Sequence, residues 1–161
     1  MSEVAFSATA IQFFVHGLPV AQGSKKVIRG NVIEMADARL RSWRQDVATT
    51  AKQTMSEEGA EAGIEPVDVR LMFFLPRPQG HYGSGRNANR LRPSAPPMPA
   101  VHPDLDKLVR AVLDALTSIC FRDDKQVVSI TAAKLYSDGD SSPGLMASVM
   151  SLTPGRASPG A

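Results

Sequence analysis

The 161-residue chain contains a single cysteine, Cys120, and a single tryptophan, and aromatic residues make up only 6% of it. One cysteine excludes an internal disulfide and any zinc site built on a Cys-x-x-Cys pair. No run of 18 apolar residues occurs, and the N-terminus lacks the basic and long apolar segments of a signal peptide. We therefore expect no membrane association and a reducing, cytoplasmic location.

The formal net charge is only +2, so total charge does not indicate a nucleic-acid-binding protein. Its distribution is more informative. Residues 20–52 carry seven Lys or Arg against three acids, residues 76–93 carry four Arg and no acid, and residues 102–124 carry five Asp against three basic residues. An acidic island in basic surroundings suits divalent cations held beside a polyanion. Chance segregation of solvated surface charge is the alternative.

Hydrophobic patterning predicts one α+β domain over residues 11–152, between a flexible N-terminus (1–10) and a flexible tail (153–161). We expect a mixed β-sheet of about four or five strands with two main α-helices packed on it. Apolar, β-prone runs predict strands at 11–15, 67–75, 126–136 and 145–152, and a short hairpin around Gly30-Asn31. Apolar spacings of three and four predict helices at 38–58, with Asp37 as N-cap, and at 104–118.

Two segments carry further expectations. Residues 67–75 alternate at first and then become continuously apolar, which is typical of a central strand. Residues 76–100 are rich in proline, glycine and arginine and show hardly any apolar periodicity. We expect a mobile loop there, without secondary structure, that a partner could order.

The acidic island begins with Asp104 and Asp106, at the start of the second predicted helix, and Asp123-Asp124 follows that helix. Each has a structural interpretation. Asp104 suits an N-cap, Asp106 complements the helix dipole, and Asp123-Asp124 suits a turn. Within a regular helix, residues two apart point about 200° from each other. Asp104 and Asp106 can therefore converge on one ion only if Asp104 lies at or before the first turn.

Pro103 favours such an abrupt start, because it biases the residue before it toward an extended conformation. Tertiary packing decides whether the Asp123-Asp124 turn lies beside Asp104, and periodicity does not settle this. If it does, three carboxylates form a site of the kind that Mg²⁺ prefers. Arg110 shares a helix face with Asp106 and Asp114. It could stabilise a phosphodiester transition state or pair with Asp114, and spacing alone favours the pair.

The series His102-Pro103-Asp104-Leu105-Asp106-Lys107-Leu108, Asp114-Ala115-Leu116 and Asp123-Asp124-Lys125-Gln126-Val127 resembles the RusA family of Holliday junction resolvases, common in phages and prophages. Gly17-x-Pro19 with Gly23-Ser24-Lys25-Lys26, Trp43 and Lys134-Leu135-Tyr136 extend the resemblance over about residues 11–150. It implies a RusA-like fold and a homodimeric endodeoxyribonuclease that depends on Mg²⁺, with Mn²⁺ as a substitute. Such an enzyme cuts four-way DNA by paired symmetric nicks in recombination and repair.

By the same resemblance Asp104, Asp106 and Asp124 are the catalytic, metal-binding carboxylates, and Asp123 is a further ligand. Arg110 stands where the family has a lysine. Arginine keeps the charge but does not give up its proton at neutral pH, so only an electrostatic role is implied. Lys107 stands where the family has an asparagine. These two departures support the alternative of a non-catalytic relative that binds branched DNA.

Basic residues near these motifs are the candidates for DNA contacts, because phosphate contacts give affinity without reading sequence. We expect them to be Lys25, Lys26, Arg77, Arg86, Arg90, Arg92, Lys107 and Lys134. Solvated loop charge is the competing interpretation for each one singly. His81-Tyr82 could stack on an unpaired base, but plain surface exposure is the interpretation that the sequence favours. A third possibility is a structural or interaction protein whose aspartates are only caps and turns.

Overall fold

The computed structural model describes residues 6–23, 26–29, 31–33, 38–139 and 141–154. Six strands and two α-helices are described, with three short 3-10 helices between them. In chain order they are β1 (Phe6–His16), β2 (Lys26–Ile28), β3 (Asn31–Ile33), α1 (Ala38–Glu57), β4 (Val67–Pro76), η1 (Gln79–His81), η2 (Gly85–Asn87), α2 (Leu105–Leu116), η3 (Asp124–Gln126), β5 (Val127–Ser137) and β6 (Gly144–Pro154).

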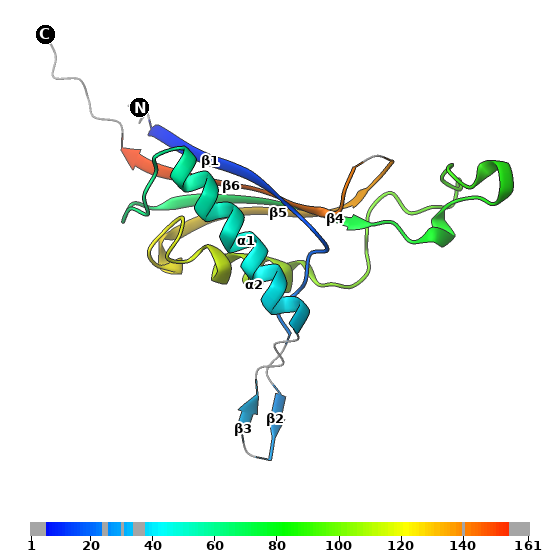
Figure 1. The fold of residues 1–161 in the computed structure, drawn as a ribbon, viewed down its shortest axis with the longest axis horizontal. Coiled ribbons are helices and arrows are strands. Elements are labelled where there is room, and N and C mark those ends of the chain that lie inside the picture. Colours follow the sequence, from blue (N-terminus) through cyan, green and yellow to red (C-terminus); the bar gives the residue numbers. More distant parts are fainter. Residues whose placement is uncertain (1–5, 24–25, 30, 34–37, 140, 155–161) are drawn as a thin grey trace, which may run out of the picture.

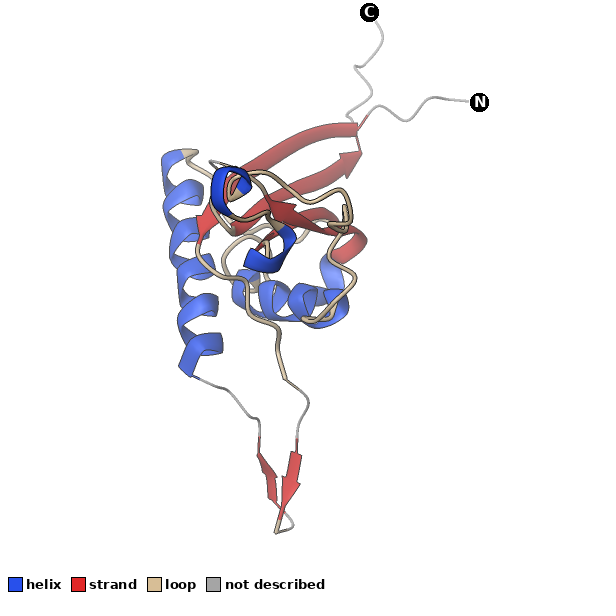
Figure 2. Ribbon diagram, turned by 90° about the vertical axis from the view of Figure 1, so that its right-hand side faces the viewer, coloured by secondary structure: helices blue, strands red, loops and turns tan. Residues whose placement is uncertain are grey.

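The four long strands form one mixed sheet in the order β1-β6-β4-β5. Strand β6 is antiparallel to both β1 and β4, whereas β5 is parallel to β4. A parallel pair needs a crossover connection, and here the connection contains α2. The predicted α+β class, with a mixed sheet and two main helices, is confirmed. Strands β2 and β3 form a separate hairpin that projects away from the sheet and helices (Figures 1 and 2).

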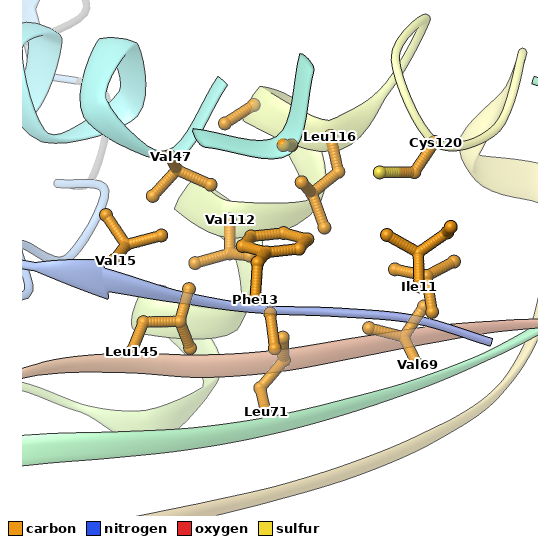
Figure 3. Packing of buried hydrophobic residues seen from close by; sticks show 14 of the residues in the cluster. Ile11, Phe13, Val15, Val47, Val69, Leu71, Val112, Leu116, Cys120 and Leu145 are labelled. Carbon is orange, nitrogen blue, oxygen red and sulfur yellow. The ribbon is translucent and has the colours of Figure 1, made fainter. Parts of the chain in front are cut away.

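The core lies between one face of the sheet and the two helices. Alternate residues of the sheet strands, such as Phe13 on β1, Leu71 on β4 and Leu145 on β6, are buried toward the helices (Figure 3). Val47 on α1 and Val112 on α2 meet them from the other side. The apolar stripes expected on both helices are therefore the faces that the structure buries. The two helices are thereby fixed on one face of the sheet.

The opposite face of the sheet has no layer over it among the described residues. Met72 on β4 is 41% exposed, and Phe14 and Phe74 are only partly buried. Strand β4 does lie between two neighbours, β6 and β5, as expected for a central strand. Both helices pack on the same side of the sheet, so the described residues cover only one face of this strand.

Element limits differ from the sequence prediction at several points. Strand β1 begins at Phe6, inside the segment expected to be flexible, because residues 6–10 pair with 150–154 of β6. Residues 7–10 are small and give no apolar signal, so the sequence did not indicate this pairing. Strand β5 begins at Val127 rather than Gln126, since residues 124–126 form η3. The predicted N-cap Asp37 lies outside the described residues.

The segment expected to be a loop without secondary structure, 76–100, has a defined path. Besides η1 and η2 it contains a bridge between Tyr82 and Leu91. We call residues 77–99 the arm, because Figure 1 shows them projecting beyond the end of β4. No helix in the described part of the chain is long and apolar enough to cross a membrane.

Candidate active site

Asp104 stands at the start of α2. Its backbone is extended, with φ −69° and ψ 136°, and its carbonyl accepts the first helical hydrogen bond, from Leu108 N at 3.1 Å. The preceding His102–Pro103 peptide bond is cis. The sharp change from extended chain to helix, expected from Pro103, is therefore present. It places the Asp104 carboxylate outside the helix proper.

The Asp104 side chain makes no capping hydrogen bond, although the sequence suggested one. Instead its Oδ1 lies 3.0 Å from His102 Nδ1, and its Oδ2 lies 3.3 Å from Lys107 Nζ. The Lys107 ammonium, helped by His102, holds the pKa of the Asp104 carboxyl below its ordinary value. Asp104 is therefore a carboxylate at neutral pH, as a ligand for a hard cation must be.

Asp106 and Arg110 follow on the exposed side of α2. Asp106 lies in the first turn, where its charge complements the helix dipole. A shallow groove beside this helix start is lined by residues 100–102, Asp104, Leu105 and Lys134. Lys134 Nζ donates to the carbonyls of Val101 at 2.6 Å and Pro103 at 2.9 Å. Lys134, predicted to contact DNA, thus ties the helix start to β5.

The Asp123-Asp124 turn forms η3, and Asp123 caps it. Asp123 Oδ1 accepts from Lys125 N at 3.0 Å, and Asp123 N donates to Gln126 Oε1 at 2.9 Å. The backbone N–H of Lys125 lowers the pKa of the Asp123 carboxyl. The Gln126 amide also donates to the carbonyls of Gly63 and Glu65. Asp123 therefore has the structural role that its turn position suggested, whereas Asp124 is exposed.

The structure does not bring Asp124 to Asp104 within one chain. Helix α2 has 12 residues and spans about 18 Å. Asp104 stands before its first residue, whereas Asp124 borders a different groove, lined also by Thr117 just after its last residue. Among the described residues no group of three or more His, Cys, Asp or Glu is arranged to hold a metal ion. The cluster of three carboxylates, expected only if the Asp123-Asp124 turn lay beside Asp104, thus does not form inside the single chain.

The groove at Asp124 contains arginines that the sequence did not single out. Arg44 of α1 and Arg122 line it together with Asp114 and Asp123. Asp114 Oδ2 lies 4.0 Å from Arg44 Nη2, so the partner of Asp114 is Arg44 rather than Arg110. No local pattern could have indicated this pair, because its members belong to two different helices. Arg44 and Arg122 add positive charge at this end of α2.

The predicted DNA-contacting residues fall into two groups. Arg86, Arg90 and Arg92 are exposed on the arm, with Arg92 Nε also donating to Tyr82 O at 2.7 Å. Arg77, Lys107 and Lys134 are engaged with other parts of the chain. Arg77 differs most from the prediction, because its side chain is only 3% exposed. Lys25 lies outside the described residues, and only the backbone of Lys26 is described, in β2.

The loop after β1 packs against the start of α2. Gln22 N donates to Lys107 O at 3.1 Å. This contact connects the stretch that leads into the β2–β3 hairpin with the first turn of the helix carrying Asp106. The loop and the acidic helix start, more than 80 positions apart in the sequence, are therefore neighbours in space.

Comparison with known proteins agrees with this arrangement of motifs. Residues 16–145 match the family described as endodeoxyribonuclease RusA. The chain is also 32% identical over 130 residues to the uncharacterized protein YqaN of Bacillus subtilis (strain 168). That alignment covers 80% of this chain and 89% of the relative.

Proposed function

Because the chain belongs to the RusA family, whose members are Holliday junction-resolving endodeoxyribonucleases, we propose that it cuts four-way DNA by Mg²⁺-dependent phosphodiester hydrolysis. The observation that carries this proposal is the start of α2. There the ionised Asp104 stands just before the first turn of the helix, and the exposed Asp106 stands in that turn. Carboxylate oxygens are the donors that Mg²⁺ prefers. The residues present therefore fit the ion, but the third carboxylate, Asp124, is missing from this end of the helix.

A homodimer would supply the missing carboxylate. Among the described strands β5 pairs with β4 alone, so its other edge has no strand partner. Residues 128–131 of this edge strand are exposed, with Val128 at 62% and Ile130 at 45%. A free edge with apolar side chains is a template for pairing with another chain. We take a second copy of this chain as the partner.

The direction of β5 supports this choice. Asp124 lies just before the strand begins, whereas Lys134, near its end, holds Pro103 O beside Asp104. Antiparallel pairing of two β5 edges about a two-fold axis near residues 130–131 sets the start of one strand opposite the end of the other. Asp124 of one copy then approaches Asp104 and Asp106 of the other. Two identical sites result, each with carboxylates from both copies.

The roles of the residues follow from their charge and position. Asp104, Asp106 and Asp124 would hold the cation, which when bound activates water and neutralises charge on the leaving oxygen. Arg110, on the exposed side of α2, keeps its proton and so can only stabilise negative charge on the phosphate. Arg86, Arg90 and Arg92, with Lys25 and Lys26, would contact the DNA backbone. A two-fold dimer matches the symmetry of a four-way junction and gives paired nicks.

The test is cleavage of an end-labelled four-way junction with Mg²⁺, and with Mn²⁺ as a substitute. Asp104→Asn should abolish nicking while junction binding in the absence of metal persists, because the amide keeps the shape but loses the charge. Asp46→Asn, which changes an exposed carboxylate on α1, is the matched control and should cut normally. Junction cleavage by Asp104→Asn at the wild-type rate would exclude the assignment.

A second candidate function is supported by Lys107. Its ammonium lies 3.3 Å from one oxygen of Asp104, while His102 occupies the other oxygen. A cation must displace these partners before it can bind there. A non-catalytic protein that binds branched DNA would need no such exchange. Persistent junction binding without nicks, in either Mg²⁺ or Mn²⁺, would favour this function.

A further inference from the structure

One side chain, that of Arg77, fixes the base of the arm. Its Nε donates to Asp138 Oδ1 at 2.7 Å, and one of its NH groups donates to Pro96 O at 2.6 Å. Its guanidinium lies 4.2 Å from the ring centroid of Tyr136, and its Nη1 lies 3.4 Å from His81 Nδ1. Only an arginine side chain can donate several hydrogen bonds in one plane, stack on an aromatic ring and keep a permanent positive charge. Arg77 therefore ties both ends of the arm, at His81 and Pro96, to the end of β5.

The arm also has an internal framework. Gly83 N donates to Arg90 O at 2.9 Å, and Arg92 N donates to His81 O at 2.8 Å. The Arg92 side chain closes the same small hairpin through its bond to Tyr82 O. These bonds use the backbone groups that a flexible loop would leave to water. The arm thus has a fixed conformation, and its surface has a defined shape.

A cleft of about 620 Å³ lies between this arm and the turn after β5. It is lined by Arg77, Gln79, Tyr82, Ala88, Asn89 and Gly139. The cleft offers two side-chain amides, each with a donor and an acceptor, and one phenol ring. Its volume is that of a small-molecule site. Amides match the hydrogen-bonding edge of a nucleobase, and an aromatic ring matches its face.

The charge around the cleft favours a phosphate ester. Asp138, whose neighbour Gly139 lines the cleft, is bound to Arg77, which lowers the pKa of the Asp138 carboxyl and neutralises its charge. Residues 76–93 carry four arginines and no acid, and Arg86 and Arg90 are exposed on the arm. A nucleobase in the cleft would therefore have cations close by for its phosphates.

We propose that the arm cleft receives an unpaired nucleotide of branched DNA, with Tyr82 against the base and Gln79 and Asn89 at its edge. This inference rests on the proposed function, since it assigns a second contact to the same substrate. Arg77 is a positioning residue here, because it holds the arm against the end of β5 and so sets the width of the cleft. A base stacked in a duplex would not enter, so the cleft favours DNA whose bases are already unpaired.

The test is metal-free binding, measured by fluorescence anisotropy, to two labelled four-way junctions. One is fully paired, and the other carries a single unpaired 2-aminopurine at the branch point. Wild-type protein should bind the second more tightly and quench its fluorescence by stacking. Tyr82→Ala should remove the quenching and weaken binding to that junction about tenfold. Tyr82→Phe, which keeps the ring, should retain both.

Asn89→Ala provides a second variant at an exposed position, in case Tyr82→Ala alters folding. It should also weaken binding to the junction with the unpaired base, whereas Gln12→Ala, on the open face of the sheet, should not. Unchanged quenching and affinity in Tyr82→Ala or Asn89→Ala would overturn the cleft assignment while leaving the nuclease proposal intact. If the wild type showed no preference for branched DNA over linear duplex, both proposals would fail together.

Discussion

If each active site combines carboxylates from two copies, two inactive variants should restore activity when they share a dimer. The variants are Asp104→Asn and Asp124→Asn, each of which is expected to be inactive alone. The reason is the geometry of α2, which spans about 18 Å and has Asp104 at its start, whereas Asp124 lines a groove at its other end. In a mixed dimer, one site receives both substitutions and the other receives none.

The expected size of the effect follows from counting sites. Random exchange of equal amounts of the two variants gives about half mixed dimers, and each of these has one intact site of two. The mixture should therefore hold about a quarter of the wild-type number of sites. If each chain instead supplied a whole site of its own, both sites of the mixed dimer would be damaged, and no activity would return.

The assay uses the two variants with different affinity tags, co-expressed and purified through both tags so that only mixed dimers remain. These dimers should nick one strand of a four-way junction per binding event rather than two opposed strands. Denaturing electrophoresis of doubly labelled junctions separates the two results. A purified mixed dimer that binds the junction but makes no nick would refute the shared-site arrangement.

Four further outcomes are expected. Ile130→Lys, which puts a charge on the β5 edge, should give a monomer in place of the proposed dimer in light scattering and abolish cleavage, while circular dichroism shows an unchanged fold. Phe121→Ala empties a fully buried position and should destabilise the fold by about 3–5 kcal/mol in urea unfolding. Burial raises the pKa of the Cys120 thiol to about 12, so iodoacetamide at pH 8 should modify it only after unfolding, as read by mass spectrometry. Arg77 lowers the pKa of Asp138, so this pair stabilises the fold above the unfolded pKa of about 3.9 and loses its effect as pH falls through the lower folded value. The difference in melting temperature between wild type and Asp138→Asn should therefore be present at pH 6 and vanish in strong acid.

Local patterns in the sequence determined most of the fold and the identity of the acidic motifs. The helix stripes through Val47 and Val112 repeat at the period of an α-helix, and the alternation around Leu71 repeats at that of a strand. Such periods depend on neighbouring residues, so they can be read without knowing the fold. The spacing of Asp104, Asp106 and Asp124 likewise indicated the family, which the comparison confirmed.

The tertiary structure alone decided how these pieces meet. Arg77 is 61 positions from Asp138, and Lys134 is 31 positions from Pro103. Neither contact leaves a periodic signal, because each depends on how distant segments pack. From the sequence alone, the side chains of Arg77 and Lys134 were therefore expected to be free to contact DNA phosphates. The same reason governs Asp124. The resemblance to the family implied that the three carboxylates act together, but the length and direction of α2 put them at two separate ends of one chain.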